Sequence, residues 1–282
     1  MKIIACMKWV PDTHDVKVDP VTNALIREGV KHIINPFDEN AIEAGLQLRE
    51  RLGGTLTVLC MGPRQAEEGL RRSIAMGADE AILLSDAAFR GSDTLATSNA
   101  LASAVRKIGE LARAPAATAM PADSVGLGID LILCGKQAID GDTAQVPAGL
   151  AERLGIPQVT FAISIEAGEN NRLRVKRVGD EAYELIEVKM PALVSVVKQI
   201  NEPRYPAMKG VLKAKKFSVK VWTAADLGVD PKTVGFDGSP TWVARTFVPS
   251  RHSRGQTLTG ATRDVVDQLA NIISALNITA QA

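Results

Sequence analysis

Apolar strand-like runs alternate with helical patterns through the first two hundred residues. The short apolar runs at 2–7, 55–61, 80–84 and 130–134 are typical of buried strands. Apolar residues recur at helical spacing between them, at 39–52, 65–76 and 94–113. Strands joined by helical crossovers pair in parallel. The alternation therefore predicts an α/β fold, with a doubly wound, mostly parallel sheet of the Rossmann-like type.

The pattern changes in the second part of the chain. Alternating strands are expected at 172–177 and 184–189, joined by a hairpin through Gly179 and Asp180. Prolines then interrupt a polar stretch until helical periodicity returns at 262–276. We therefore expect one α/β domain over residues 1–200, and over 201–282 an arm that packs on a partner subunit; a flexible extension is the alternative.

Charge and composition exclude several classes of protein. The 33 Lys and Arg nearly balance the 32 Asp and Glu, so the net charge of +1 predicts neither nucleic acid nor a membrane surface as partner. No apolar stretch is long enough to serve as a signal peptide or to cross a membrane, which predicts a cytoplasmic protein. The three cysteines and three histidines are dispersed, so no metal site is expected.

A change of chemistry at residues 130–146 marks the candidate site. Ligands of open α/β sheets bind beyond the carboxyl ends of strands, and here a buried strand is followed by small, cationic, acidic and hydroxyl side chains. Gly135 and Gly141 allow close approach of a ligand, Lys136 offers a cation, and a helix opening at Thr143 would favour phosphate. This pattern favours a nucleotide; an ordinary solvated loop is the alternative.

The common nucleotide motifs are missing. Gly126-Leu127-Gly128 precedes a strand instead of following one, which excludes a dinucleotide fingerprint there. Gly135-Lys136 lacks the upstream glycine of a P-loop. An adenine-nucleotide-binding regulator or an ATP-using enzyme on the same sheet stays open as an alternative from these residues alone.

Several separated motifs together resemble one family. These are Asn35-Pro36-Phe37, the run from Gly135 to Asp142, Asn201-Glu202-Pro203-Arg204-Tyr205, and Lys213-Ala214-Lys215-Lys216. In this order they closely resemble the β-subunit of electron-transfer flavoproteins. The resemblance implies a heterodimer with a flavin-holding α-subunit, and a second nucleotide in this chain, which is AMP in simple carriers and FAD in electron-bifurcating members. It implies an electron-transfer subunit rather than a stand-alone enzyme, with no catalytic acid or base.

The resemblance also assigns a cofactor pocket. The implied residues come from two strand ends, the start of the first helix and the glycine loop: Cys6, Asn35, Pro36, Phe37, Asp38, Met61, Gly135, Lys136, Gln137, Ala138, Ile139, Asp140, Gly141, Asp142, Thr143, Ala144, Gln145 and Val146. Asn35 is expected to offer its amide to adenine or ribose. Asp140 and Asp142 are expected to cap backbone or contact ribose, because inward carboxylates would repel phosphate.

The segment Asp93-Thr94-Leu95-Ala96-Thr97 bears on which nucleotide is bound. Its Asp and Ser neighbours predict a helix cap. The segment also resembles the bifurcating branch, which implies FAD in the pocket and electrons passing between NADH, ferredoxin and a flavin dehydrogenase. An AMP-binding carrier that shuttles electrons from acyl-CoA-type dehydrogenases is the alternative within the family.

A docking loop for the partner dehydrogenase is expected at Asn201, Glu202, Pro203, Arg204 and Tyr205, with Ile200 as its apolar anchor. Ile200 buried at the end of a strand is the alternative. The nearby lysines 209, 213, 215 and 216 are expected either to steer an acidic partner or to form a solvated face.

Overall fold

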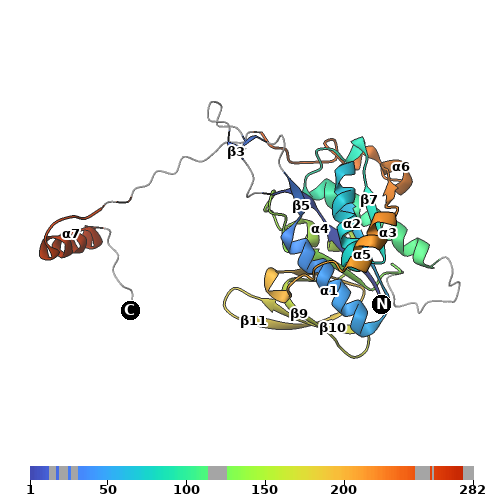
Figure 1. Ribbon diagram of the computed structural model, residues 1–282, viewed down its shortest axis with the longest axis horizontal. Helices are drawn as coiled ribbons and strands as arrows, with labels where there is room; N and C mark the ends of the chain where they lie inside the picture. Colours follow the sequence, from blue (N-terminus) through green and yellow to red (C-terminus); the bar gives the residue numbers. More distant parts are fainter. Residues whose placement is uncertain are drawn as a thin grey trace. The chain divides into compact units, whose positions relative to one another are not determined.

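The computed structural model describes residues 1–12, 17–18, 25–26, 31–113, 126–244, 255 and 257–275. Two units, Met1–Arg245 and Thr246–Ala282, are described separately. The first, shown in Figure 1, contains a large sheet. This sheet has nine strands in the order β11-β10-β9-β12-β8-β1-β6-β7-β13. Its strands are β1 (Lys2–Met7), β6 (Thr55–Met61), β7 (Glu80–Leu84), β8 (Leu131–Gly135), β9 (Gln158–Ala167), β10 (Arg172–Val178), β11 (Tyr183–Lys189), β12 (Ala192–Val196) and β13 (Lys220–Trp222).

Most strand pairs of this sheet are parallel, and only β10 pairs antiparallel, with β9 and β11. The β10–β11 pair is the hairpin expected through Gly179 and Asp180. Two short pairs lie outside the sheet: β2 (Trp9–Pro11) with β5 (His32–Ile34), and β3 (Lys17–Val18) with β4 (Leu25–Ile26). The predicted doubly wound, mostly parallel sheet is confirmed.

Helices cover both faces of the sheet. One apolar core joins α1 (Pro36–Leu52), α2 (Glu67–Met76) and α5 (Met208–Lys216) to the sheet. A second core joins α3 (Thr94–Arg113), α4 (Val146–Leu154) and α6 (Ala224–Leu227) to the opposite face. Single 3-10 turns are η1 (Arg64–Ala66), η2 (Ala87–Phe89), η3 (Lys198–Ile200) and η4 (Pro231–Thr233). Every strand of the sheet centre is therefore buried on both sides, which explains its continuous apolar runs.

The strand order reverses next to β1. From β1 the chain moves to β6 and β7 on one side, and then crosses to β8 on the other side. Such a reversal opens a crevice beyond the carboxyl ends of the two diverging strands, which is where ligands of open α/β sheets bind. The carboxyl ends of β1 and β8, at Met7 and Gly135, mark this crevice.

The segment after Asn201 contributes to the sheet-bearing unit. Helix α5 packs into the same core as α1 and α2, and β13 extends the sheet beside β7. The compact unit therefore ends at Arg245 rather than at residue 200. Prolines and short element lengths hid these elements from the sequence pattern. No helix among the described residues is long and apolar enough to span a membrane.

The second unit contains helix α7 (Thr262–Ala275), which the periodicity predicted. Its larger apolar side chains Val266, Leu269 and Ile273 are exposed and recur at helical spacing. A helix with one uncovered apolar face is typical of a segment that packs on another protein. The expectation of a partner-binding arm stays a prediction.

Candidate functional site

A cavity of about 380 Å³ lies at the reversal of strand order. Its floor contains Cys6 and Met7 from β1 together with Cys134 and Gly135 from β8. The walls come from the start of α1, the start of α3 and the loop between β8 and α4. This is the position that the topology predicts for a ligand, and the volume is within the usual range of about 300–1,000 Å³ for small-molecule sites.

Most of the residues expected at the site line this cavity. They are Cys6, Asn35, Asp38, Met61, Asp93, Thr94, Thr97, Gly135, Gln137, Ala138, Gly141, Asp142, Thr143, Ala144, Gln145 and Val146. Seven others do not line it: Pro36, Phe37, Leu95, Ala96, Lys136, Ile139 and Asp140. The structure thus brings together the segments 35–38, 93–97 and 135–146, which are far apart in the sequence. Some residues of each segment do not line the cavity.

Asp38 ties the two floor strands together. One carboxylate oxygen accepts a hydrogen bond from the Lys8 backbone N–H at 2.8 Å, and the other accepts one from the Gly135 backbone N–H at 3.0 Å. Burial raises the pKa of Asp38 to about 7, against the hydrogen bonds from Lys8, Asn35 and Gly135, which lower it. Its role is therefore to hold the ends of β1 and β8 in position beneath the cavity.

Asn35 lines the cavity and also connects the glycine loop to the start of α1. Its fully buried amide donates from Nδ2 to the Gln137 carbonyl at 2.8 Å and accepts from the Ile139 N–H at 3.2 Å. The Asp38 backbone N–H donates to the Asn35 carbonyl at 2.8 Å. The two side-chain bonds hold the glycine loop against the start of α1. They use one of the two Nδ2 hydrogens and one lone pair of Oδ1, so the contact of Asn35 with adenine or ribose stays a prediction.

The glycine loop places its charged side chains differently from the sequence expectation. The ammonium of Lys136 lies over the Phe161 ring, 5.3 Å from the ring centre, and not in the cavity. Asp140 forms an ion pair with Lys8 at 2.7 Å, and Asp142 accepts a hydrogen bond from the Gln137 side chain. The two carboxylates are thus held by side chains rather than by backbone caps.

The helix after this loop also begins later than expected. Asp142 and Ala144 have φ angles of 54° and 55°, which interrupt a right-handed helix. Helix α4 starts at Val146, with Pro147 in its first turn, where proline is favoured. The expected opening at Thr143 is therefore wrong by three positions, although Thr143 still lines the cavity.

Asp93 caps α3, as expected, and also makes a second attachment. One carboxylate oxygen accepts from the Leu95 and Ala96 N–H groups at 2.9 and 3.0 Å. The other accepts from the Thr241 N–H and hydroxyl at 3.1 and 2.8 Å. Burial raises the pKa of Asp93, but these hydrogen bonds outweigh it and hold the pKa below its usual value.

Two helix N-termini meet at the cavity. Thr94 in the first turn of α3 donates from its hydroxyl to the Gln145 side chain at 3.0 Å, immediately before α4. Both Thr94 and Val146 line the cavity. The start of α3 is already capped by the Asp93 carboxylate, whereas α4 has no side-chain cap, so the uncapped N-terminus of α4 favours a negatively charged group in this space.

The end of β1 at Met7 lies at the cavity, as strand-end reasoning expects, but that reasoning missed seven other lining residues: Lys8, Phe89, Gly91, Ser92, Leu101, Cys134 and Pro147. Lys8 is the most informative, because it follows β1 directly. The rule that located Gly135 at the end of β8 also applies to the end of β1, and would have found Lys8. The cation expected from Lys136 is thus supplied at the cavity by Lys8.

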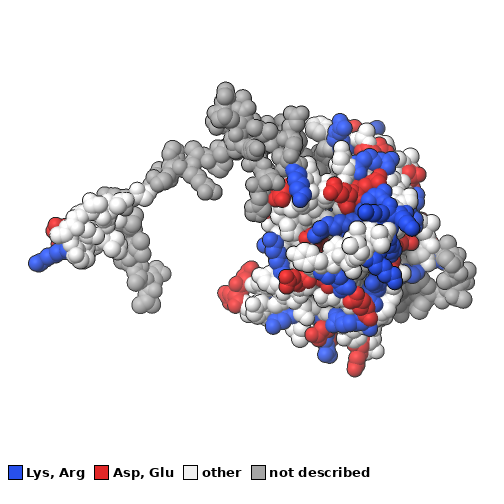
Figure 2. All heavy atoms as spheres, in the orientation of Figure 1, with Lys and Arg blue, Asp and Glu red and all other residues white. Residues whose placement is uncertain are grey.

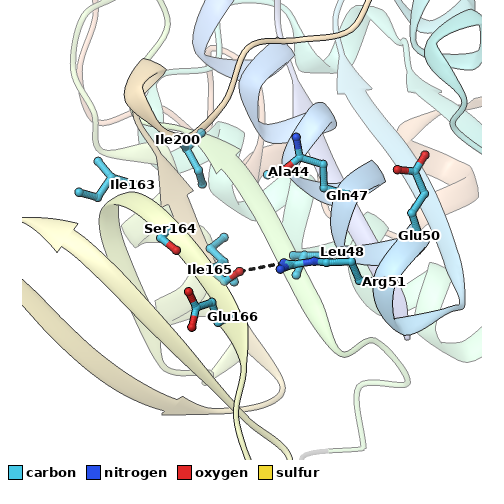
Figure 3. A pocket seen from close by; sticks show the side chains of 10 residues that line it. All are labelled: Ala44, Gln47, Leu48, Glu50, Arg51, Ile163, Ser164, Ile165, Glu166 and Ile200. Carbon is cyan, nitrogen blue, oxygen red and sulfur yellow. Dashed lines mark hydrogen bonds between the residues drawn. The ribbon is translucent and has the colours of Figure 1, made fainter.

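The expected docking loop lies away from this cavity, beside a second one. Ile200 lines a groove of about 330 Å³ between α1 and β9, where it is half-buried and packs against the core (Figure 3). Tyr205 and Met208 are the prominent apolar side chains of this region, with 89% and 76% of their surfaces exposed. Lys and Arg side chains surround α2 and α5 on the same face as acidic groups (Figure 2).

Comparison with known proteins agrees with this geometry. The sequence profile described as the electron transfer flavoprotein domain matches residues 22–227. The electron transfer flavoprotein subunit beta of Thermoanaerobacterium thermosaccharolyticum is 45% identical over 279 residues, covering 99% of this chain and 100% of the relative. This chain belongs to the electron transfer flavoprotein family. The family that the separated motifs predicted is thus confirmed, and the alignment with this relative extends over nearly the whole chain.

Two further relatives of this electron transfer flavoprotein chain carry more specific names. One is the caffeyl-CoA reductase-Etf complex subunit CarD of Acetobacterium woodii, 44% identical over 263 residues, with 93% of each chain covered. Another is protein FixA of Azorhizobium caulinodans, 44% identical over 263 residues, with 92% of this chain and 88% of the relative covered. Each alignment thus extends over most of both chains.

Proposed function

We propose that this electron transfer flavoprotein chain is the β-subunit of a heterodimer, binds FAD in the cavity at the strand reversal, and takes part in electron bifurcation. Electrons would enter from NADH and leave to ferredoxin and, through a flavin on the α-subunit, to a flavin dehydrogenase. The observation that supports this most is the meeting of the α3 and α4 N-termini at a cavity lined by Asp93, Thr94 and Thr97.

The hydrogen-bond donors at the cavity fit a dinucleotide, whose pyrophosphate is negatively charged. The α4 start and the loop before it would hold phosphate, because the first N–H groups of a helix have no partner within it. Gly141 leaves room for a ligand, since a Cβ added there would have the Lys8 Nζ, 3.9 Å away, as its nearest neighbour. The hydroxyls of Thr94 and Thr97 would contact the part of the cofactor that extends past α3.

FAD supplies two-electron and one-electron redox chemistry when bound. The chain's own contribution is position and charge. Asp38 and Asn35 hold the floor and the glycine loop in place without help from a ligand. The positive dipole end of α4 would favour the negative charge of the cofactor phosphates, and the Asp93 carboxylate occupies the N-terminus of α3.

AMP in the same cavity is the second candidate. AMP would use the same lining, with its phosphate at the start of α4. With AMP, the chain would be the β-subunit of a simple carrier that shuttles electrons from acyl-CoA-type dehydrogenases. We infer FAD rather than AMP because the Asp93–Thr97 segment, three residues of which line the cavity, resembles the bifurcating branch of the family.

The docking function rests on a separate surface. Tyr205 and Met208 expose large apolar side chains near one another in the sequence, and exposed aromatic and Met side chains are enriched at protein interfaces. The name of the CarD relative places that protein in a complex with a reductase. We therefore propose Tyr205 and Met208 as contacts for the dehydrogenase in addition to the expected anchor Ile200, which lines the neighbouring groove.

The test is to co-purify the chain with its α-subunit, denature the complex, and quantify released FAD and AMP per heterodimer. Two FAD per heterodimer support the proposal. One FAD and one AMP would identify a simple carrier, and no adenine nucleotide beyond the α-subunit flavin would refute the assignment of the cavity. Ferredoxin reduction by NADH that requires the dehydrogenase and its substrate would then establish bifurcation.

A further inference from the structure

Arg204 binds two carboxylates of α1 at once. Its guanidinium pairs bidentately with Glu43, Nε to Oε2 at 2.8 Å and Nη2 to Oε1 at 2.9 Å. It also pairs with Glu50, Nη2 to Oε2 at 3.0 Å, and the Arg204 backbone N–H donates to Glu43 at 3.2 Å. Glu43 and Glu50 lie two turns apart on α1, so a single side chain spans that stretch of helix.

The pair with Glu43 is the buried part of this arrangement. Only 4% of the Glu43 side chain is exposed, and the Gln47 amide is its other partner. A buried carboxylate without its cation costs several kcal/mol, so Glu43 strongly favours the position of Arg204 seen here. Hydrogen bonds to Glu50 and Glu43 raise the pKa of Arg204, and the hydrogen bond from Arg204 lowers the pKa of Glu50.

A second attachment lies three residues earlier. The Asn40 side chain donates to the Asn201 carbonyl at 2.8 Å, and the Asn201 side chain donates to the Asn40 carbonyl at 3.0 Å. Residues 201–207 belong to no helix or strand. Side chains therefore fasten this segment to α1 at both ends of the sequence Asn201–Arg204.

The fastened segment leads directly to the exposed docking residues. Ile200 packs against the core at the groove of Figure 3, which Glu50 of α1 also lines. Tyr205 follows Arg204 directly, and Met208 begins α5. An exposed side chain on an irregular segment loses conformational entropy when a partner binds, and prior ordering of the segment reduces that loss.

We propose that Arg204 is a positioning residue for the docking surface, and does not itself contact the dehydrogenase. With Glu43 and Glu50 it orders residues 201–207, so that Tyr205 and Met208 are presented in one arrangement to an apolar depression on the partner. This inference rests on the proposed docking function. It explains why Arg204, although it lies in the expected docking loop, donates its guanidinium hydrogen bonds to Glu43 and Glu50 of its own chain.

The test uses the full heterodimer and measures the electron-transfer rate against dehydrogenase concentration. Arg204→Gln should raise the KM for the dehydrogenase by about tenfold, through the lost ordering, with kcat changed by less than about twofold. Amide hydrogen exchange in 201–207 should increase, while FAD content and assembly stay unchanged. In the double variant Glu43→Gln/Arg204→Gln no buried carboxylate is left without its cation, and this variant should show the same change in KM.

Arg72→Gln is the matched control. It removes an ion pair of similar length, Arg72 Nε to Glu39 at 2.9 Å, also on α1 but without a link to the loop. Its KM should equal that of the natural chain. The proposal fails if the Arg204 variants exchange faster but keep their KM, or if neither property changes.

A Tyr205→Ala/Met208→Ala variant separates this inference from the docking function. If that variant raises KM and the Arg204 variants do not, the positioning role alone is refuted. If neither variant set changes KM, the docking surface itself has been wrongly placed.

Discussion

Replacing Gly135 by alanine should destabilise the protein through contacts within the chain. A Cβ at this position would lie 2.3 Å from the Asp38 Oδ1, 2.6 Å from the Phe37 Cβ and 2.7 Å from the Phe37 carbonyl carbon. Two of these neighbours are fixed by the backbone at the start of α1. The Asp38 oxygen accepts the Gly135 N–H, so moving it away breaks the bond that joins β8 to α1.

The expected cost has two parts. Overpacking a core position costs about 1–3 kcal/mol, and leaving a buried hydrogen-bonding group unsatisfied costs about 1–3 kcal/mol more. We therefore expect Gly135→Ala to lower the free energy of unfolding by about 2–6 kcal/mol, a large share of the about 5–15 kcal/mol typical of a domain. Urea denaturation of the apoprotein measures this loss directly.

Gly141→Ala is the control in the same loop. Its Cβ would meet nothing closer than the Lys8 Nζ at 3.9 Å, and its φ is not in the left-handed region. Stability should therefore change by less than about 0.5 kcal/mol. A Gly135→Ala variant as stable as Gly141→Ala would refute the reasoning. A stable Gly141→Ala that binds nucleotide poorly would show that this glycine, unlike Gly135, serves the ligand.

Three further predictions concern the cavity wall. Because burial raises the pKa of Asp38 to about 7, the folded chain keeps a proton that the unfolded chain loses from about pH 4. Stability should fall by about 1.4 kcal/mol per pH unit between about pH 4 and pH 7, and pH-dependent urea denaturation of Asp38→Asn should lack this slope. Asp93→Ala should cost about 1–2 kcal/mol through the lost cap, and hydrogen exchange should rise at Thr241 as well as in α3. Lys8→Met should change stability by less than about 1 kcal/mol, because its pair with Asp140 is exposed, while weakening nucleotide binding by equilibrium titration.

The sequence was sufficient for the elements with strong local periodicity. Helix α3 begins at Thr94 and ends at Arg113, as the apolar spacing predicted, and β1, β6 and β7 have the predicted bounds. The parallel order followed from the alternation of these elements. Helix α5 and strand β13 were not visible, because nine and three residues between prolines carry too little periodic signal.

The cavity could be located from sequence, but the direction of its side chains could not. The rule that ligands bind beyond the carboxyl ends of strands predicts which segments reach the cavity. The structure confirms that the ends of β1 and β8 both lie there. Whether a residue in such a segment points inward depends on partners far away in the sequence. Lys136 lies over Phe161, and Asn35 is bound by residues 137 and 139. No local pattern indicates either contact.

The same long-range contacts imply that the cavity exists before a ligand binds. Asp38 bonds both floor strands, and Asn35 bonds the glycine loop, through groups that a nucleotide does not have to supply. A site held in this way spends little binding energy on ordering itself. The apoprotein should therefore show slow hydrogen exchange at the Gly135 and Ile139 amides, with only modest further slowing when nucleotide is added. Fast exchange at both amides in the apoprotein would instead mean that the ligand organises the loop, and the scaffold roles assigned to Asn35 and Asp38 would then be wrong.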